Sequence, residues 1–298
     1  MSNKHQENRE DFSLLKDALL KDWNIFNVNS SKIYVLIKEI CKNKYQENPK
    51  LFEEAVGILS LYDKKFKDKF SILKSLTCNE FTYELKHQNR YHLDWFNKEI
   101  FEEIIGYAST TFEENHLFYR ARIAKNDEEI SSKKMGSPPN EKSLNGRLNP
   151  RGISYLYLAS SEDIAIKEVR ARMHDSVTIG SFELLKKIEI IDLTKIDKFS
   201  PFLGNALGFD YEKYAVNNEH LRNIAKEFLI PTKRNDSFLT YLPSQYIAEF
   251  IKSKGKKGIK YESTMDNKGY NLVIFEEELL ECKQVNSYEI VDVHYGRQ

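Results

Sequence analysis

The chain has 298 residues, 41% of them hydrophobic and 30% charged, a mixture that can build a packed core and that argues against a wholly disordered chain. Lys and Arg number 45, as do Asp and Glu, so the net charge is zero and gives no bulk electrostatic reason to expect nucleic-acid binding. Three cysteines at no metal-ligand spacing, a polar N-terminus without an apolar leader, and no apolar run of roughly 18 residues together predict a cytoplasmic protein that does not bind a membrane.

The first third of the chain has the spacing of amphipathic helices. Ile33, Ile37 and Ile40 recur at intervals of three to four residues, which is typical of one buried helix face, and similar patterns follow. No strand is expected before His116. We therefore expect an all-helical N-terminal domain over residues 1–110.

From residue 111 the pattern changes to short β-rich segments separated by helices. Strands are expected at 117–123, 153–159, 187–194 and 271–275, and helices at 161–173 and 243–254. A long loop rich in Ser, Gly, Pro and Asn precedes the second strand. Because strands and helices do not alternate regularly, we expect an α+β domain over residues 111–298.

The long loop ends in a glycine beside an arginine, Gly146-Arg147, followed by Asn149 and Pro150. A glycine allows the backbone to approach a ligand closely, and a guanidinium offers a planar fork to a phosphate. The same residues are also ordinary turn formers, and this local pattern leaves both interpretations open.

Glu168 lies in the helix expected after the second strand, beside the apolar Ala165 and Val169. A carboxylate at the edge of a buried face can stabilise positive charge that develops on a sugar carbon. The alternative is a solvated glutamate paired with Arg172 at i+4.

Two arginines and a serine complete the candidate residues. Arg120 and Arg122 lie two apart in a strand, so both side chains leave the same face, either to bind an anion or to form an exposed edge with paired charges. Ser263 lies between two strands, where serine is usually a turn residue.

Taken in order, these motifs resemble the RES domain family, which is named for its Arg, Glu and Ser. The matching segments are Tyr-Arg (119–120), Gly-Arg-x-Asn-Pro-x-Gly (146–152), Leu-Tyr (156–157), Ala-x-x-Glu (165–168), Tyr-x-Ser (261–263) and Asn-Leu-Val-x-Phe (271–275). Residues 241–249 and 258–261 also resemble the longer members of the family. The resemblance covers roughly residues 115–276.

The resemblance implies a fold and an activity. The fold is an ADP-ribosyltransferase-like split β-structure with flanking helices that holds NAD. Members of the family act as the toxin of toxin–antitoxin pairs and deplete cellular NAD by hydrolysis or phosphorolysis. The partners implied are therefore NAD, as substrate, and an antitoxin protein; a homo-oligomer also remains open.

The resemblance also implies which residues bind NAD. Arg120 and Arg147 are expected to hold the pyrophosphate through charge-assisted hydrogen bonds. Tyr157 is expected to pack against the nicotinamide or its ribose, and Tyr119, beside Arg120, to contribute to the same site.

Glu168 and Ser263 are the remaining family residues. Glu168 is expected to bind the nicotinamide ribose and to stabilise the cationic sugar as nicotinamide leaves, and Ser263 to hydrogen-bond within the pocket. No metal is expected, because nicotinamide in NAD is already a cationic leaving group.

The match to the family has one departure and one ambiguity. Leu148 stands where the family usually has Trp after the second arginine, and Ser244, in Pro-Ser-Gln, is a rival for the family serine. Ser263 is preferred because the strand that follows it matches the family.

The N-terminal segment resembles helical domains of the HEPN type, but residues 1–110 lack the Arg-to-His spacing of HEPN ribonucleases, so we expect a regulatory or partner-binding role.

Two other functions remain open. One is an ADP-ribosyltransferase that modifies a protein or a nucleic acid. The other is a non-enzymatic binding protein, whose best support is the lysine-rich run from Lys252 to Lys260; such runs are more often solvated.

Overall fold

The computed structural model describes residues 12–22, 25–26, 28–124, 128–198, 210–229, 238–265 and 269–293. The chain forms two compact units: a helical unit (residues 1–78, 93–100 and 197–221) and a sheet unit (residues 79–92, 101–196 and 222–298). Because the chain enters each unit more than once, the division does not fall at one point of the sequence. The boundary expected at residue 110 stays a prediction, as does the resemblance of the N-terminal segment to HEPN domains.

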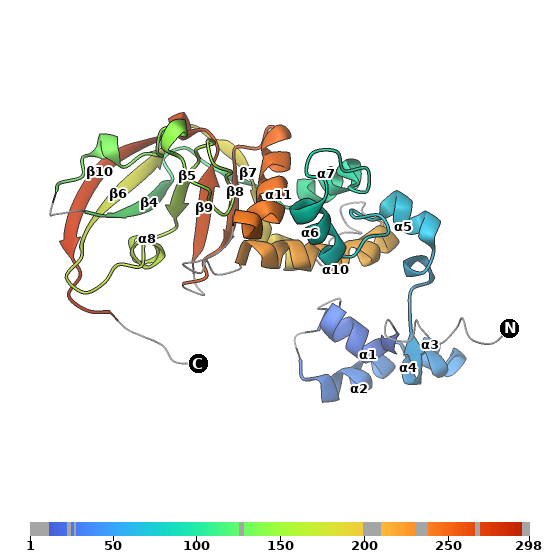
Figure 1. The fold of residues 1–298 in the computed structure, drawn as a ribbon. Helices are drawn as coiled ribbons and strands as arrows, with labels where there is room; N and C mark the ends of the chain where they lie inside the picture. Colours follow the sequence, from blue (N-terminus) through green and yellow to red (C-terminus); the bar gives the residue numbers. More distant parts are fainter. Residues whose placement is uncertain are drawn as a thin grey trace. The chain divides into compact units, whose positions relative to one another are not determined.

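The N-terminal part of the helical unit is built from short helices (Figure 1). These are α1 (Leu15–Asp17), the π-helix η1 (Ala18–Asp22), α2 (Ser30–Ile40), α3 (Lys42–Glu47), α4 (Lys50–Glu53), η2 (Leu59–Leu61) and α5 (Lys64–Phe70). Ile33 and Ile37 of α2 pack with Phe52 of α4, but Ile40, which was expected on the same buried face, is 66% exposed. The helical character is confirmed, with one addition: β1 (Ser13–Leu14) and β2 (Ala55–Val56) form a two-residue antiparallel pair.

Three further helices have residues in both units: α6 (Cys78–His87), α7 (Lys98–Tyr107) and α10 (Tyr211–Leu229). Within the helical unit, the buried Asn217 of α10 accepts a hydrogen bond from Ile72 N and donates one to Phe70 O, both at 2.7 Å. In the described part of the chain, none of the helices combines the length and the apolar character needed to cross a membrane.

The sheet unit contains one mixed sheet of eight strands, which confirms the α+β class (Figure 1). In spatial order the strands are β10 (Leu280–Glu289), β6 (Ser176–Leu184), β4 (Leu117–Ile123), β5 (Leu156–Ala159), β9 (Tyr270–Ile274), β8 (Gly258–Glu262), β7 (Ile188–Asp192) and β3 (Ser109–Phe112). All neighbours are antiparallel except β7 and β8. The helical segments of this unit are η3 (Ser132–Lys134), η4 (Asn140–Lys142), α8 (Glu162–Glu168), η6 (Phe238–Tyr241), α11 (Leu242–Ser253) and η7 (Glu277–Leu279); η5 (Leu193–Lys198) begins in this unit, and its last two residues belong to the helical unit.

Alternation along the strands gives the sheet two different faces. Phe118 and Leu158 belong to a large apolar core on one face. Ala121 and Ala159 point to the other face, where they pack with Ile164 of α8. Small side chains on this face allow α8 to lie close to β4 and β5, so the helix and its last residue are held by apolar contact with the sheet.

The sheet is almost interrupted between β4 and β5. Seven consecutive residues of β4 pair with β6, and all four residues of β5 pair with β9. In contrast, β4 and β5 share a single register pair, Tyr119 with Ala159. The residues of β4 after Tyr119 therefore have no paired strand on the side of β5. The pockets described below open at this split between β4 and β5.

Several expected elements differ from the structure. The expected strand 117–123 coincides with β4, but the helix expected over 161–173 ends at Glu168. Arg170 adopts a left-handed conformation (φ 52°), which stops the helix without the glycine that usually marks such a point. Strands β6 and β10 were not expected, and β3 precedes His116; β10 escapes notice because it is a largely polar edge strand.

Candidate active site

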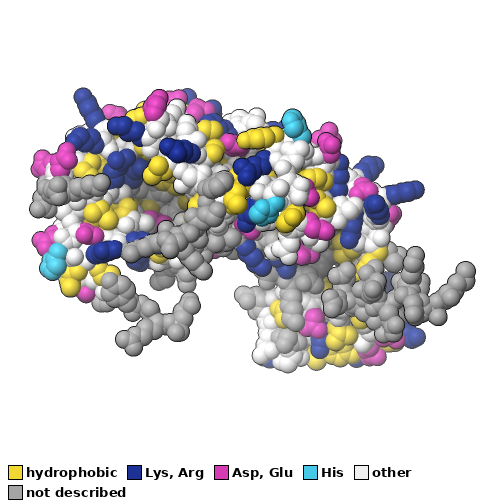
Figure 2. Space-filling model, in the orientation of Figure 1, with side chains coloured by type: hydrophobic (Ala, Val, Ile, Leu, Met, Phe, Trp, Pro, Cys, Tyr) yellow, Lys and Arg dark blue, Asp and Glu magenta, His cyan; other side chains and the backbone are white. Residues whose placement is uncertain are grey.

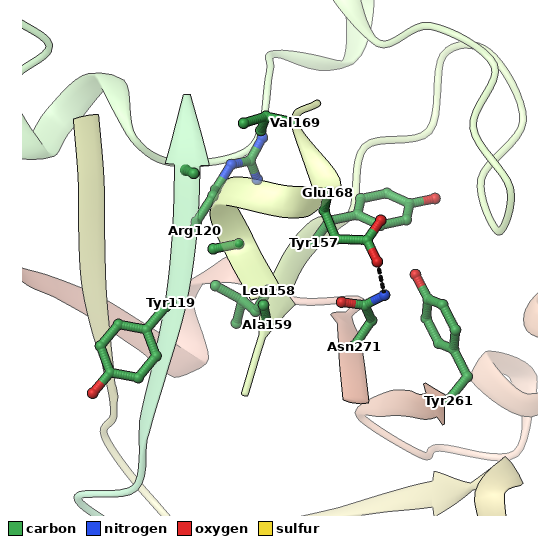
Figure 3. A pocket seen from close by; sticks show the side chains of 11 residues that line it. Tyr119, Arg120, Tyr157, Leu158, Ala159, Glu168, Val169, Tyr261 and Asn271 are labelled. Atoms are coloured by element: carbon green, nitrogen blue, oxygen red, sulfur yellow. Dashed lines mark hydrogen bonds between the residues drawn. The ribbon is translucent and has the colours of Figure 1, made fainter. Parts of the chain in front are cut away.

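A pocket of about 250 Å³ opens where the split between β4 and β5 meets the end of α8. This glutamate pocket is lined by Tyr119, Arg120, Ala121, Tyr157, Leu158, Ala159, Ala165, Glu168, Val169, Tyr261 and Asn271. Figure 3 shows Glu168 pointing toward Asn271 and Tyr261, while Arg120 extends from β4 toward Val169. The pocket thus brings together a carboxylate and a guanidinium from different elements.

Glu168 is anchored by two hydrogen bonds to the same oxygen. Ser263 Oγ donates to Glu168 Oε1 at 2.8 Å, and Asn271 Nδ2 donates to Glu168 Oε1 at 2.7 Å (Figure 3 shows the second). The side chain of Ser161 caps the other end of the helix by accepting from Ile164 N. Among the described residues, no ion pair joins Glu168 to Arg172, so the alternative of a solvated i+4 pair is wrong.

The two candidate serines occupy different places. Ser263 follows β8, is 5% exposed, and accepts a hydrogen bond from Met265 N while donating to Glu168. Ser244, at the start of α11, donates instead to the backbone carbonyls of Arg147 and Tyr241. The structure therefore brings Ser263, and not Ser244, to the carboxylate.

Arg120 and Arg122 both carry buried nitrogen atoms that lack a partner. Arg120 Nη1 and Arg122 Nε are buried and have no hydrogen-bond partner among the described residues, although Arg122 Nη2 donates to Gly136 O. Burial, and then the charge of Arg122, lowers the pKa of Arg120 to about 10; the carboxylate of Glu277 partly offsets both effects. Two partly buried guanidinium groups, each with a buried nitrogen that lacks a hydrogen-bond partner, can bind an anion.

A second pocket of about 550 Å³ adjoins the first. This loop pocket is lined by Arg120, Ala121, Arg122, Ile123, Pro138, Lys142, Ser143, Leu144, Asn145, Gly146, Asn149, Ser154, Tyr155, Tyr157 and Val169. Four residues line both pockets: Arg120, Ala121, Tyr157 and Val169. The two pockets are therefore neighbours along one cleft of the sheet unit, with Arg120 at their junction.

The two tyrosines expected to bind NAD point differently. Tyr157 lines both pockets; its hydroxyl donates to Asn149 Oδ1 at 2.7 Å and accepts from Leu148 N at 3.1 Å, and burial raises its pKa to about 12. Tyr119 lines the glutamate pocket, but in Figure 3 its ring points away from Glu168. Tyr157 is thus a rigid, uncharged wall of the cleft.

Arg147 is turned toward the protein. Its Nη1 donates to Phe228 O, in the last turn of α10, at 2.6 Å, and its guanidinium lies 5.7 Å from the ring centre of Tyr261. Arg147 lines neither the glutamate pocket nor the loop pocket as the described residues define them. A direct role in phosphate binding stays a prediction for Arg147, while Arg122 lines the loop pocket.

The comparisons with known proteins point to one family. Residues 117–294, more than half of the chain, match the RES domain family. The chain belongs to the RES domain family. Among solved structures, it is similar to a chain of the M. tuberculosis MbcT–MbcA toxin–antitoxin complex, at 16% identity and a TM-score of 0.37, over 63% of this chain and 91% of that one. No curated protein matches it.

The RES domain of this chain contains functional groups that its sequence did not single out. In the sequence Asn271 has no role beyond the strand and the motif that it begins, although an Asn at the start of an apolar run is the signal of a buried polar group that needs a partner. Gln245 of α11 donates to Asn145 Oδ1, Gly146 O and Asn149 O, and so holds the loop that carries Arg147. Leu148, a residue of the same loop, is fully buried.

The lysine-rich run of the RES domain is paired rather than free. Lys254, Lys256, Lys257 and Lys260 contact Glu102, Glu189, Glu276 and Asp192, respectively. Figure 2 shows basic and acidic side chains interspersed over the visible face. The run therefore gives no support to the binding-protein alternative.

In the described parts of the chain, no three His, Cys, Asp or Glu residues cluster closely enough to hold a metal ion.

Proposed function

We propose that this RES domain cleaves the bond between nicotinamide and ribose in NAD, and that the protein acts as a toxin by depleting cellular NAD. The observation that carries the proposal is the anchored carboxylate of Glu168 in a cleft whose other wall holds the unpartnered Nη1 of Arg120. A carboxylate and a cation that line one pocket suit a substrate with a sugar carbon near one and a phosphate near the other.

The number of carboxylates in the pocket favours NAD over an ordinary glycoside. Glycosidases generally use two, because the leaving oxygen must be protonated by a second acid. Among the described residues lining the glutamate pocket, Glu168 is the sole carboxylate. Nicotinamide leaves NAD as a neutral molecule that keeps the electron pair of the broken C–N bond, so it needs no proton from the protein.

The reaction then proceeds through a cationic sugar. As the C–N bond breaks, positive charge develops on the ribose, and the fixed negative charge of Glu168 stabilises it. An acceptor attacks the same carbon and loses a proton. Water gives ADP-ribose, phosphate gives a phosphorylated ADP-ribose, and a macromolecule gives an ADP-ribosylated product.

The size of the cleft is consistent with a dinucleotide. The glutamate pocket, at about 250 Å³, lies below the roughly 300–1,000 Å³ of typical ligand sites, whereas the adjoining loop pocket adds about 550 Å³. With the nicotinamide nucleoside at Glu168, the pyrophosphate would lie near Arg120 and the adenosine would extend into the loop pocket. Binding of an antitoxin, assembly into a homo-oligomer and a cytoplasmic location stay predictions.

The test is the NAD concentration over time with the purified full chain, with and without phosphate. We expect NAD to fall and nicotinamide to appear in equal amount. ADP-ribose indicates hydrolysis, its phosphorylated form indicates phosphorolysis, and radiolabel fixed to protein or nucleic acid indicates transfer. Intact NAD under all these conditions, together with unchanged NAD in cells that express the protein, would contradict the proposal.

Gly146 gives a prediction about the shape of the cleft. A Cβ atom at this position would overlap Asn149 Oδ1 and lie 2.9 Å from the hydroxyl oxygen of Tyr157. We expect Gly146→Ala to displace the Tyr157 wall and to lower kcat/KM for NAD roughly 100-fold, since a shift of about 1 Å in a site has that effect. The measurement is steady-state kinetics with NAD.

The matched control is Gly106→Ala in α7, where no atom lies within 4 Å of the new Cβ. Its kinetics should equal those of the wild type, with a stability gain of about 0.5–1 kcal/mol from the better helix propensity of Ala. Equal kinetics in Gly146→Ala and Gly106→Ala would show that the Tyr157 wall does not shape the NAD site.

A further inference from the structure

Asn271 is a buried amide in the middle of the sheet that faces the Glu168 carboxylate. It lies on β9 between β5 and β8, opposite Ala159 on one side and Tyr261 on the other, and is 5% exposed. Its Nδ2 donates to Glu168 Oε1 at 2.7 Å (Figure 3). Because an ionised carboxylate only accepts hydrogen bonds, the amide must present its nitrogen to Glu168.

The position of Glu168 creates a need for such a donor. Glu168 is the last residue of α8, where the unpaired carbonyl groups give the helix a partial negative charge. A carboxylate at that end is unfavourable unless donors offset the repulsion. Asn271 and Ser263 supply neutral donors, which hold the anion without cancelling the charge that the cationic sugar requires.

Both donors bind one oxygen of the carboxylate. Ser263 Oγ and Asn271 Nδ2 converge on Oε1, and in the described part of the chain no group hydrogen-bonds Oε2. Two donors from different directions fix the rotation of the carboxylate plane, which one donor alone does not. The second oxygen is thereby left for the substrate.

We propose that Asn271 is a positioning residue that orients Glu168 so that Oε2 faces the reacting sugar carbon of NAD. This inference rests on the proposed NAD cleavage. Asn271 acts through Glu168 rather than on the substrate, so its loss should lower kcat while leaving the KM for NAD nearly unchanged.

The test is the Asn271→Asp substitution, studied from pH 6 to 9. The introduced carboxyl group is almost the same size as the amide, so packing is conserved. Two carboxyl groups at hydrogen-bond distance share one proton at low pH, and the protonated partner then donates to Glu168 as the amide did. At higher pH the shared proton is lost and the two charges repel, so the activity should fall.

Three ionisable groups that line the pocket with Glu168 keep their protonation state in this range. Burial lowers the pKa of Arg120 on β4 only to about 10, and burial raises the pKa values of Tyr157 on β5, to about 12, and of Tyr261 on β8. The remaining neighbours are Tyr119 on β4, Ser263 after β8, and Lys167 and Arg170 beside Glu168 on its own segment. We therefore expect a flat wild-type profile and an acid-shifted profile for Asn271→Asp.

At pH 8 the kcat of Asn271→Asp should be roughly 100-fold below that of the wild type, and part of the loss should be recovered at pH 6. Asn271→Leu removes the donor permanently and should show the same loss at every pH. If Asn271→Asp keeps a kcat within twofold of the wild type with an unchanged pH profile, the inference is overturned.

Carbon-13 NMR of carboxyl groups separates this failure from failure of the proposed function. A wild-type chain that does not consume NAD would contradict NAD cleavage alone. The titration of Glu168 in Asn271→Asp still reports the contact: coupled titration of the two carboxyl groups supports the positioning role, and independent titration overturns it.

Discussion

The Glu168→Gln substitution is expected to lower kcat for NAD cleavage roughly 1,000-fold while the protein folds normally. Removing one preorganised group that stabilises transition-state charge typically costs about 10²–10³-fold, and here the group carries a full charge. The carbonyl oxygen of glutamine can still accept the hydrogen bonds from Ser263 and Asn271, so the fold loses little. Steady-state kinetics and the thermal unfolding temperature measure the two effects separately.

Glu162→Gln is the matched control, because Glu162 begins the same helix and lines neither pocket. It should retain the wild-type kcat. Calorimetric titration of NAD should show that Glu168→Gln binds NAD with a dissociation constant within severalfold of the wild-type value. Full activity in Glu168→Gln would remove Glu168 from the chemistry.

The Arg120→Met substitution is expected to weaken NAD binding without destabilising the protein. A charge-assisted hydrogen bond contributes about 1.5–3 kcal/mol, so the affinity should fall roughly 10- to 100-fold. Folding lowers the pKa of Arg120 to about 10, so the charged side chain reduces the free energy of unfolding. This destabilisation is present below about pH 10, where Arg120 stays charged in the folded protein. We therefore expect the free energy of unfolding of Arg120→Met to be no lower than that of the wild type.

Arg147→Met is the matched comparison, and the opposite pattern is expected. Arg147 Nη1 donates to Phe228 O, so its loss leaves that carbonyl without this bond and should cost about 1–3 kcal/mol of unfolding free energy. Its effect on NAD affinity should be smaller than that of Arg120→Met. Urea unfolding measures the loss of stability in both variants, and calorimetric titration measures the loss of NAD affinity. If Arg147→Met loses more free energy of NAD binding than free energy of unfolding, Arg147 is a direct NAD ligand.

The elements that depend on local patterning were predictable. The aromatic, β-rich composition of residues 117–123 predicts β4 to the residue, and the helix expected over 243–254 is α11 within one residue at each end. These segments form where side-chain periodicity and backbone geometry agree without help from distant residues. The end of α8 was not predictable, because Arg170 adopts a conformation that is unusual for a residue other than glycine.

By itself, the sequence determined the α+β class of the RES domain and identified Glu168, Arg120 and Ser263 as candidate site residues. Motif order and strand periodicity depend only on the order of residues along the chain, so no tertiary structure is needed to find them. Only the tertiary structure decided which groups meet. Glu168 hydrogen-bonds Ser263 and Asn271, 95 and 103 residues away, and Arg147 turns to Phe228, 81 residues away. Such contacts depend on the path by which β5, α8, β8 and β9 come together at the split in the sheet, and a side chain's partner at that range is not encoded in its neighbours.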